Sequence, residues 1–195
     1  MKVITGSARG RNLVSVEGLE TRPTSQRTKE SIFNSIQFDI EGRRVLDLFA
    51  GTGQMGIEAL SRGAESAVFV DTRRDCAAAI RKNLEHTKFL DVATVETTDF
   101  RNYIKKAPPE SFGLIFLDPP YETGMLKQAV SQIMRRDLLY YGGLIVCEGD
   151  RDDELPEPIG AYTKGREYVY GRTKITLFMK IQGEEHEDSG VSGQL

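Results

Sequence analysis

The sequence predicts an α/β fold with a mostly parallel sheet, helices on both of its faces and an antiparallel hairpin at its C-terminal end. After residue 44, short apolar runs typical of buried strands alternate with segments of helical periodicity, which is the pattern of a parallel sheet. Residues 168–170 and 175–179 are strand-like and flank Gly171-Arg172-Thr173-Lys174, which indicates the hairpin. The 195 residues suffice for one domain with a full core.

An arm of about 40 residues comes before the sheet. Its Arg9-Gly10-Arg11 segment is typical of a turn, and a helix is expected from about Ser25 to Ile36. Thr24 or Ser25 is suited to cap the start of this helix. One apolar face of the helix predicts that it packs against the domain; that face consists of Ile32, Phe33 and Ile36.

Five strands are expected between the arm and the hairpin, because five apolar runs lie next to turn or helix signals. They cover 45–49, 67–70, about 93–96, 114–117 and 144–147, the last preceded by Gly142-Gly143. The helices between them are expected at 55–62, about 73–86, 100–105 and 125–136. Gly63 is placed to cap the first of these helices, and the Pro- and acid-rich stretch 151–158 supplies at most a short helix.

The charges are unevenly distributed, and the formal net charge of -3 hides this. Residues 181–195 contribute -4 and leave 26 basic against 25 acidic residues in the remainder, while the first 36 residues hold six basic and three acidic side chains. A locally basic arm is weak support for a nucleic-acid partner; on charge alone an ordinary solvated surface is favoured. The chain is divided into the arm and its helix (1–40), the main domain (41–182) and a tail expected to be disordered (183–195).

Composition argues against several other classes of protein. No apolar run approaches the roughly 20 residues that span a bilayer, and the N-terminus lacks the apolar core of a secretory signal, so a cytoplasmic protein is expected. Cys76 and Cys147 suggest no disulfide framework, and with only His86 and His186 there is no zinc spacing. We therefore expect no metal.

A glycine-rich loop follows the first predicted strand. Gly51-Thr52-Gly53-Gln54-Met55-Gly56 opens a helix, and Asp71 ends the next strand 20 residues beyond Gly51. Glycines let a ligand approach the backbone, and the acid can accept hydrogen bonds from ribose hydroxyls. In this context the motif predicts a nucleotide-binding site.

Asp47, which lies inside the first predicted strand, is the residue that distinguishes between the possible nucleotides. An extra carboxylate is unfavourable beside a pyrophosphate, but it stabilises the ammonium and sulfonium of S-adenosylmethionine. Asp99, after the third strand, is suited to bind the adenine amino group, with Phe100 as a stacking face. A helix cap is an equally weighted interpretation of Asp99.

A second motif, Asp118-Pro119-Pro120-Tyr121, follows the apolar strand 114–117 directly. Neither proline donates a hydrogen bond and each fixes its own φ, so the turn is rigid. A carboxylate, proline carbonyls and an aromatic ring suit a planar base with an exocyclic amino group, because the acceptors bind the amino hydrogens and the ring stacks on the base. An ordinary strand-end turn with a surface tyrosine is the simpler alternative.

Three motifs together resemble one family. Arg22-Pro23-Thr24, the segment Asp47-Leu48-Phe49-Ala50-Gly51-Thr52-Gly53 and Asp118-Pro119-Pro120-Tyr121 are similar in order and spacing to the bacterial small-subunit (16S) ribosomal RNA guanine-N2 methyltransferases, over about residues 1–180. Many members have phenylalanine at the position of Tyr121, and either ring can stack. The resemblance implies a Rossmann-like methyltransferase fold with a mostly parallel seven-stranded sheet.

The resemblance also implies an activity: methyl transfer from S-adenosylmethionine to the exocyclic N2 of a guanine in small-subunit ribosomal RNA, free or within an assembled or assembling subunit. The catalytic residues implied are Asp118, Pro119, Pro120 and Tyr121. The cofactor would lie against Asp47, Phe49, Gly51, Gly53, Asp71, Asp99 and Phe100. RNA phosphates would be bound by the arm residues Arg9, Arg11, Arg22, Thr24, Arg27 and Lys29. A monomer is the default expectation.

Three alternatives stay open. An adenine-N6 methyltransferase acting on DNA or RNA needs the same amino-group chemistry. A non-catalytic RNA-binding assembly protein of the same fold has no need of the Asp-Pro-Pro-Tyr turn. An NAD-dependent oxidoreductase lacks an obvious catalytic His or Tyr-Lys pair. A pyrimidine C5 methyltransferase is disfavoured because Cys76 and Cys147 are expected to be buried structural residues.

Overall fold

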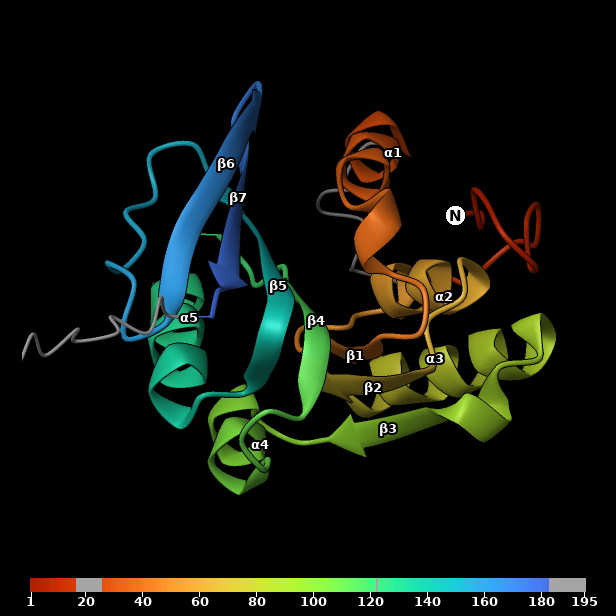
Figure 1. Cartoon of the computed structure of the whole chain (residues 1–195). Coiled ribbons are helices and arrows are strands. Elements are labelled where there is room, and N and C mark those ends of the chain that lie inside the picture. Colours follow the sequence, from red (N-terminus) through yellow and green to blue (C-terminus); the bar gives the residue numbers. More distant parts are fainter. Residues whose placement is uncertain (17–25, 122, 183–195) are drawn as a thin grey trace, which may run out of the picture.

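A seven-stranded sheet runs through the part of the chain that the structure describes, which comprises residues 1–16, 26–121 and 123–182 of the computed structural model (Figure 1). The strands are β1 (Arg44–Asp47), β2 (Ser66–Asp71), β3 (Ala93–Thr97), β4 (Phe112–Leu117), β5 (Leu139–Asp150), β6 (Tyr162–Tyr170) and β7 (Thr173–Lys180). Their order is β3-β2-β1-β4-β5-β7-β6; the first five strands are parallel, and β7 is antiparallel to both of its neighbours, β5 and β6. The predicted fold class, including the C-terminal hairpin, is confirmed.

Helices cover both faces of the sheet. They are α1 (Gln26–Ser35), α2 (Gln54–Ser61), α3 (Arg74–Thr87), α4 (Phe100–Lys106) and α5 (Met125–Arg136), with short 3-10 helices at Gln37–Asp39 and Leu90–Val92. Apolar residues of α1, α2 and α3 belong to one buried cluster, and those of α4 and α5 belong to a second. Gly63 follows α2 with φ +99°, as its predicted capping position requires.

The largest departure from the predicted elements is β5, which begins at Leu139 rather than after Gly142-Gly143. Leu139 is fully buried and pairs with Phe112 of β4, and a shift of register between Phe112 and Leu114 absorbs the intervening glycines. The free energy gained by burying Leu139 therefore exceeds the preference of Gly142 and Gly143 for a turn that would end the strand. The stretch 151–158 contains no helix.

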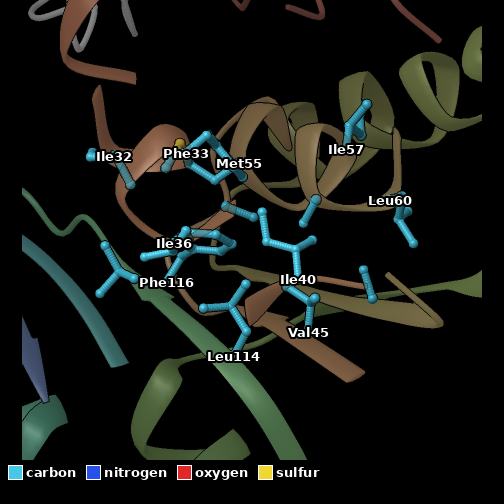
Figure 2. Packing of buried hydrophobic residues seen from close by; sticks show 14 of the residues in the cluster. Ile32, Phe33, Ile36, Ile40, Val45, Met55, Ile57, Leu60, Leu114 and Phe116 are labelled. Atoms are coloured by element: carbon cyan, nitrogen blue, oxygen red, sulfur yellow. The ribbon is translucent and has the colours of Figure 1, made fainter. Parts of the chain in front are cut away.

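Helix α1 packs on the sheet beside α2, as its apolar face predicted (Figure 2). Ile32, Phe33 and Ile36 are all buried, and the Phe33 ring lies 5.5 Å from the Phe116 ring of β4, centroid to centroid. Burying three such side chains contributes on the order of 5–8 kcal/mol before entropy is counted. Because Phe116 precedes the Asp118–Tyr121 turn by two residues, this contact holds α1 close to that turn.

The start of the arm is fixed by Glu58 of α2, a contact that the sequence did not reveal. This carboxylate is fully buried and accepts hydrogen bonds from the backbone N–H of Ile4 at 2.8 Å and of Thr5 at 3.0 Å. The next residue, Gly6, has φ +85°, and a Cβ there would lie 1.7 Å from the carbonyl oxygen of Ser61. Only glycine permits this approach, so the arm is held tightly on the end of α2.

The arm also contributes to the same core as the sheet, through Val3, Ala8 and Leu13. An antiparallel bridge between Lys2 and Asn12 closes it into a loop. Among the described residues, no helix combines the length and apolarity needed to cross a membrane.

Candidate active site

A cavity of about 1090 Å³ opens at the carboxyl ends of the parallel strands. It lies where the strand order reverses between β1 and β4, the position at which open α/β sheets bind ligands. Loops after β1, β2, β3 and β4 all contribute to its lining. The predicted cofactor residues Asp47, Phe49, Gly51, Asp71, Asp99 and Phe100 line it together with the whole of the Asp118–Tyr121 turn. The structure thus brings the two predicted motifs into one cavity.

The glycine loop is held by two carboxylates. The backbone N–H of Gly51 donates to Oδ2 of Asp71 at 2.9 Å, and that of Gly56 donates to Oδ2 of Asp47 at 3.0 Å. Gly53 has φ +79°, so its conformation favours glycine. Gly56 lies so close to Phe69 that a Cβ would come within 2.3 Å of that ring. Gly56 is therefore needed for packing of α2 on β2.

Asp47 combines burial with a lining position. Only 4% of it is exposed, and burial is the main cause that raises its pKa to about 7. The hydrogen bond from Gly56 opposes this rise, and the charge of Asp71 adds to it. A cation in the cavity would lower the pKa of Asp47 again, because it would offset the lost hydration of the carboxylate.

Asp71 uses both carboxylate oxygens to shape the loop, since its Oδ1 accepts the backbone N–H of Arg73 at 2.9 Å. An ionised carboxylate offers about four acceptor sites, so capacity remains for ribose hydroxyls. Phe100 is 3% exposed, and its ring packs on Phe49 at a centroid distance of 5.0 Å. These two rings form an apolar part of the cavity wall.

The helix-cap interpretation of Asp99 is confirmed, and its binding of adenine stays a prediction. Its side chain caps α4 by accepting the backbone N–H of Arg101 at 2.9 Å, and it also lines the cavity. The side-chain hydrogen bond from the Arg101 guanidinium is the main cause that holds the pKa of Asp99 below its usual value. Asp99 is therefore an ionised acceptor at neutral pH.

The Asp118–Tyr121 turn continues β4 into the cavity. The side chain of Asp118 faces the open space of the cavity. The pKa of Asp118 is nevertheless raised well above its usual value, mainly because the surrounding protein reduces the hydration of the carboxylate, and further because the charges of Glu148 and Asp47 lie nearby. The hydroxyl of Tyr121 is 3.1 Å from Oγ1 of Thr173 in β7. The hairpin therefore fixes the ring of Tyr121, a contact that phenylalanine could not make.

Glu148 of β5 is a lining residue that sequence reasoning missed. It is 7% exposed and directly follows the strand segment Leu144–Cys147, as Asp118 follows β4. An acid at the end of a predicted strand next to the motif strand was the signal that could have identified it.

The end of the described arm also lines the cavity, through Ser15 and Val16, together with Met1. Asn83 of α3 holds this segment: its side chain accepts the backbone N–H of Val14 at 2.7 Å and donates to the carbonyl of Thr52 in the glycine loop at 2.9 Å. The arm and the cofactor loop are thereby joined by a single buried amide. Nothing in the sequence marked Asn83.

The predicted RNA-binding residues have different outcomes. Arg9 is exposed, and Arg11 is partly exposed and donates to the carbonyl of His86. Arg22, Thr24 and the side chain of Arg27 lie outside the described residues. Lys29 is a correction: it is 3% exposed and pairs with Glu58 at 3.3 Å, so it does not reach a surface that RNA could contact. Its position on the apolar side of α1 explains the difference.

Comparisons with known proteins support one family. The family model described as Conserved hypothetical protein 95 matches residues 1–179. A Bacillus subtilis protein named putative rRNA methyltransferase YlbH is 42% identical over 92% of this chain and 99% of its own length. Ribosomal RNA small subunit methyltransferase D of Escherichia coli is 30% identical over 96% of this chain and 94% of its own length.

Solved structures show the same architecture. A structure titled putative methyltransferase yhhF from Escherichia coli superposes with a TM-score of 0.83 at 30% identity, covering 93% of this chain and 98% of that one. A more distant fold neighbour, at 16% identity with a TM-score of 0.64 over 81% of this chain and 50% of its own, is a putative methyltransferase complexed with SAH. The full-length match to the family model and to these relatives shows that this chain belongs to the Conserved hypothetical protein 95 family.

Proposed function

We propose that this protein transfers a methyl group from S-adenosylmethionine to the exocyclic N2 of a guanine in small-subunit ribosomal RNA. One observation carries the proposal: the glycine loop and the Asp118–Tyr121 turn line the same cavity. The names of the relatives, which are ribosomal RNA methyltransferases, agree with it. The volume of about 1090 Å³ has room for a nucleoside cofactor and a purine base together.

The lining residues fit S-adenosylmethionine. Asp99 would accept the adenine amino group, the apolar wall of Phe49 and Phe100 would contact the ring, and Asp71 would accept ribose hydroxyls. Asp47, whose pKa is raised to about 7 mainly by burial, would be stabilised as a carboxylate by the cofactor's ammonium group. A dinucleotide would instead bring its pyrophosphate near Asp47, which is unfavourable.

The second half of the site positions the acceptor. A guanine would stack on Tyr121, whose orientation is fixed by Thr173, after leaving its helical stack at a cost of a few kcal/mol. Asp118 and the carbonyl of Pro119 would accept the two N2 hydrogens and turn the nitrogen lone pair out of conjugation with the base. Positioning of this kind needs no strong base, and a rigid proline turn provides it.

The chemical step then needs little more. S-adenosylmethionine, when bound, supplies an electrophilic methyl group. The N2 lone pair would form the new N–C bond as the S–C bond of the cofactor broke and released S-adenosylhomocysteine, and the N2 proton would leave to Asp118 or to water. The raised pKa of Asp118 makes it a better proton acceptor than an ordinary carboxylate.

RNA phosphates would contact the exposed cations of the arm. Arg9 and, in part, Arg11 are accessible, and Arg22 and Arg27 stay in the proposal on their sequence position alone. Glu58 and Asn83 attach residues 4–14 of the arm to α2 and α3, and the neighbouring Ser15 and Val16 line the cavity.

Adenine-N6 methylation is the second candidate, because the same turn can bind the amino group of adenine. The decisive experiment is transfer of labelled methyl groups onto unmodified small subunits and onto naked ribosomal RNA, followed by digestion to nucleosides. N2-methylguanosine supports the proposal, and the better substrate shows whether assembly precedes methylation. Label in N6-methyladenosine rejects it in favour of the adenine enzyme, and no label despite measurable cofactor binding favours a non-catalytic binder.

A further inference from the structure

Glu148 and Asp118 occupy equivalent places on adjacent parallel strands. Phe116 of β4 is in register with Val146 of β5, and the next residues, Leu117 and Cys147, are also in register. One residue further on, Asp118 directly follows the end of β4, and Glu148 lies within β5, two residues before its last residue, Asp150. Figure 1 shows these two strands side by side in the middle of the sheet.

Alternation along the strands gives both acids the same direction. Phe116 and Val146 belong to the cluster on the α1 and α2 side, whereas Leu117 and Cys147 belong to the cluster on the α4 and α5 side. The side chain after this pair returns to the α1 and α2 side, because successive side chains alternate. Glu148 pairs with Ile175, which belongs to the α1 and α2 cluster as well.

Glu148 therefore enters the acceptor half of the cavity beside Asp118. It lines this cavity and is 7% exposed. Its charge is also the largest charge effect on Asp118, which places the two carboxyl groups close together. A carboxylate accepts hydrogen bonds, so Glu148 could accept one from a base held at the Asp118–Tyr121 turn.

The bases differ in what they present beside their amino group. Guanine carries a hydrogen on N1 next to its N2 amino group, so these two neighbouring groups are both donors. Adenine carries an unprotonated N1 next to its N6 amino group, so the same edge offers an acceptor. A carboxylate accepts a hydrogen bond from the guanine N1–H but faces the lone pair of the adenine N1, which is repulsive.

We propose that Glu148 reads the N1–H of the target base and thereby selects guanine over adenine. This inference rests on the proposed function and adds a specificity-determining residue to it. Asp118 and the Pro119 carbonyl bind the amino group that both bases share, while Glu148 binds the neighbouring atom at which they differ. A site that hydrogen-bonds a donor of its substrate discriminates strongly against an analogue that presents a lone pair in its place.

The test uses Glu148→Gln, since a glutamine can either accept from N1–H or donate to an unprotonated N1. Its matched control is Glu154→Gln, an exposed carboxylate that lines only a neighbouring cavity of about 110 Å³. The substrates are reconstituted small subunits that carry guanine, 2-aminopurine or adenine at the target position, once labelling has mapped it. 2-Aminopurine keeps the N2 amino group but has an unprotonated N1.

The wild type and Glu154→Gln should methylate guanine at least roughly 10- to 100-fold faster than 2-aminopurine. In Glu148→Gln the rate of guanine methylation should fall, and the ratio of the guanine rate to the 2-aminopurine rate should approach one, while the affinity for S-adenosylmethionine stays unchanged. Glu148→Asp, which keeps a carboxylate, should preserve the ratio even if its rate is lower. That variant also separates a recognition role from a purely structural one.

Two failures are distinguishable. If the wild type methylates guanine and Glu148→Gln keeps the wild-type ratio, the inference is overturned and the proposed function stands. If the wild type forms no N2-methylguanosine, the proposed function itself is wrong, and the role of Glu148 falls with it.

Discussion

Removal of Glu58 is the perturbation whose cost the structure defines best. This carboxylate is fully buried and accepts the backbone N–H of Ile4 and Thr5 at 2.8 and 3.0 Å. It also pairs with Lys29 at 3.3 Å and with Arg62 at 2.9 Å. Glu58→Ala leaves the Lys29 charge buried, a situation that costs about 3–5 kcal/mol. Against a typical stability of about 5–15 kcal/mol, this is a large fraction.

Urea denaturation measures this cost. With an m value of about 2 kcal/mol/M, a loss of 3–5 kcal/mol lowers the midpoint by about 1.5–2.5 M. Lys29→Met should cost much less, because Glu58 keeps Arg62 and the two backbone donors. The double variant Lys29→Met/Glu58→Ala should be more stable than Glu58→Ala alone. In the double variant the buried Lys29 cation, which Glu58→Ala leaves without its carboxylate, is absent. Equal costs for the two single variants, or strictly additive costs in the double variant, would refute this reasoning.

Three further predictions concern the site. Asp118→Ala should bind S-adenosylmethionine as the wild type does by calorimetric titration but lose turnover; near-normal methylation of small subunits would reject its role. Because burial raises the folded-state pKa of Asp47 from 3.8 to about 7, the folded protein binds more protons than the unfolded chain between these values, so stability should fall as pH rises from about 4 to 7. Asp47→Asn should flatten that part of the profile of unfolding free energy against pH, and an unchanged slope would contradict the assigned burial effect. Arg9→Ala and Arg22→Ala should weaken RNA binding and reduce its salt slope by roughly 0.7–0.9 per lost phosphate contact without changing cofactor affinity; salt-independent losses would remove these residues from the RNA surface.

The motifs made the cavity predictable because their chemistry is local. A strand followed by glycines, or by acid, prolines and a ring, specifies its own turn, and parallel strands bring such turns to the same edge of a sheet. This is why Asp47, Asp99 and Asp118 could be placed in one site before any geometry was known. The elements around them differed mainly in their end residues, with β5 as the exception because Leu139 is buried.

What the sequence did not disclose depends on contacts between distant residues. Lys29 looked like one of several surface cations, and only the packing of α1 beside α2 shows that it faces Glu58. Asn83 joins Val14 to Thr52 across separate parts of the chain, a contact that no local pattern encodes. The place of Glu148 directly after the predicted strand 144–147 was a signal in the sequence, but only the pairing of β4 with β5 shows that it lies next to Asp118.

The most direct test of the central claim is the identity and number of the modified nucleosides in small subunits treated with this protein. Mass spectrometry of digested ribosomal RNA should show one N2-methylguanosine per subunit after treatment with the wild type and none after treatment with Asp118→Ala. Methylation of a different base, or equal N2-methylguanosine formation by the two proteins, would contradict the account of a guanine bound at the Asp118–Tyr121 turn.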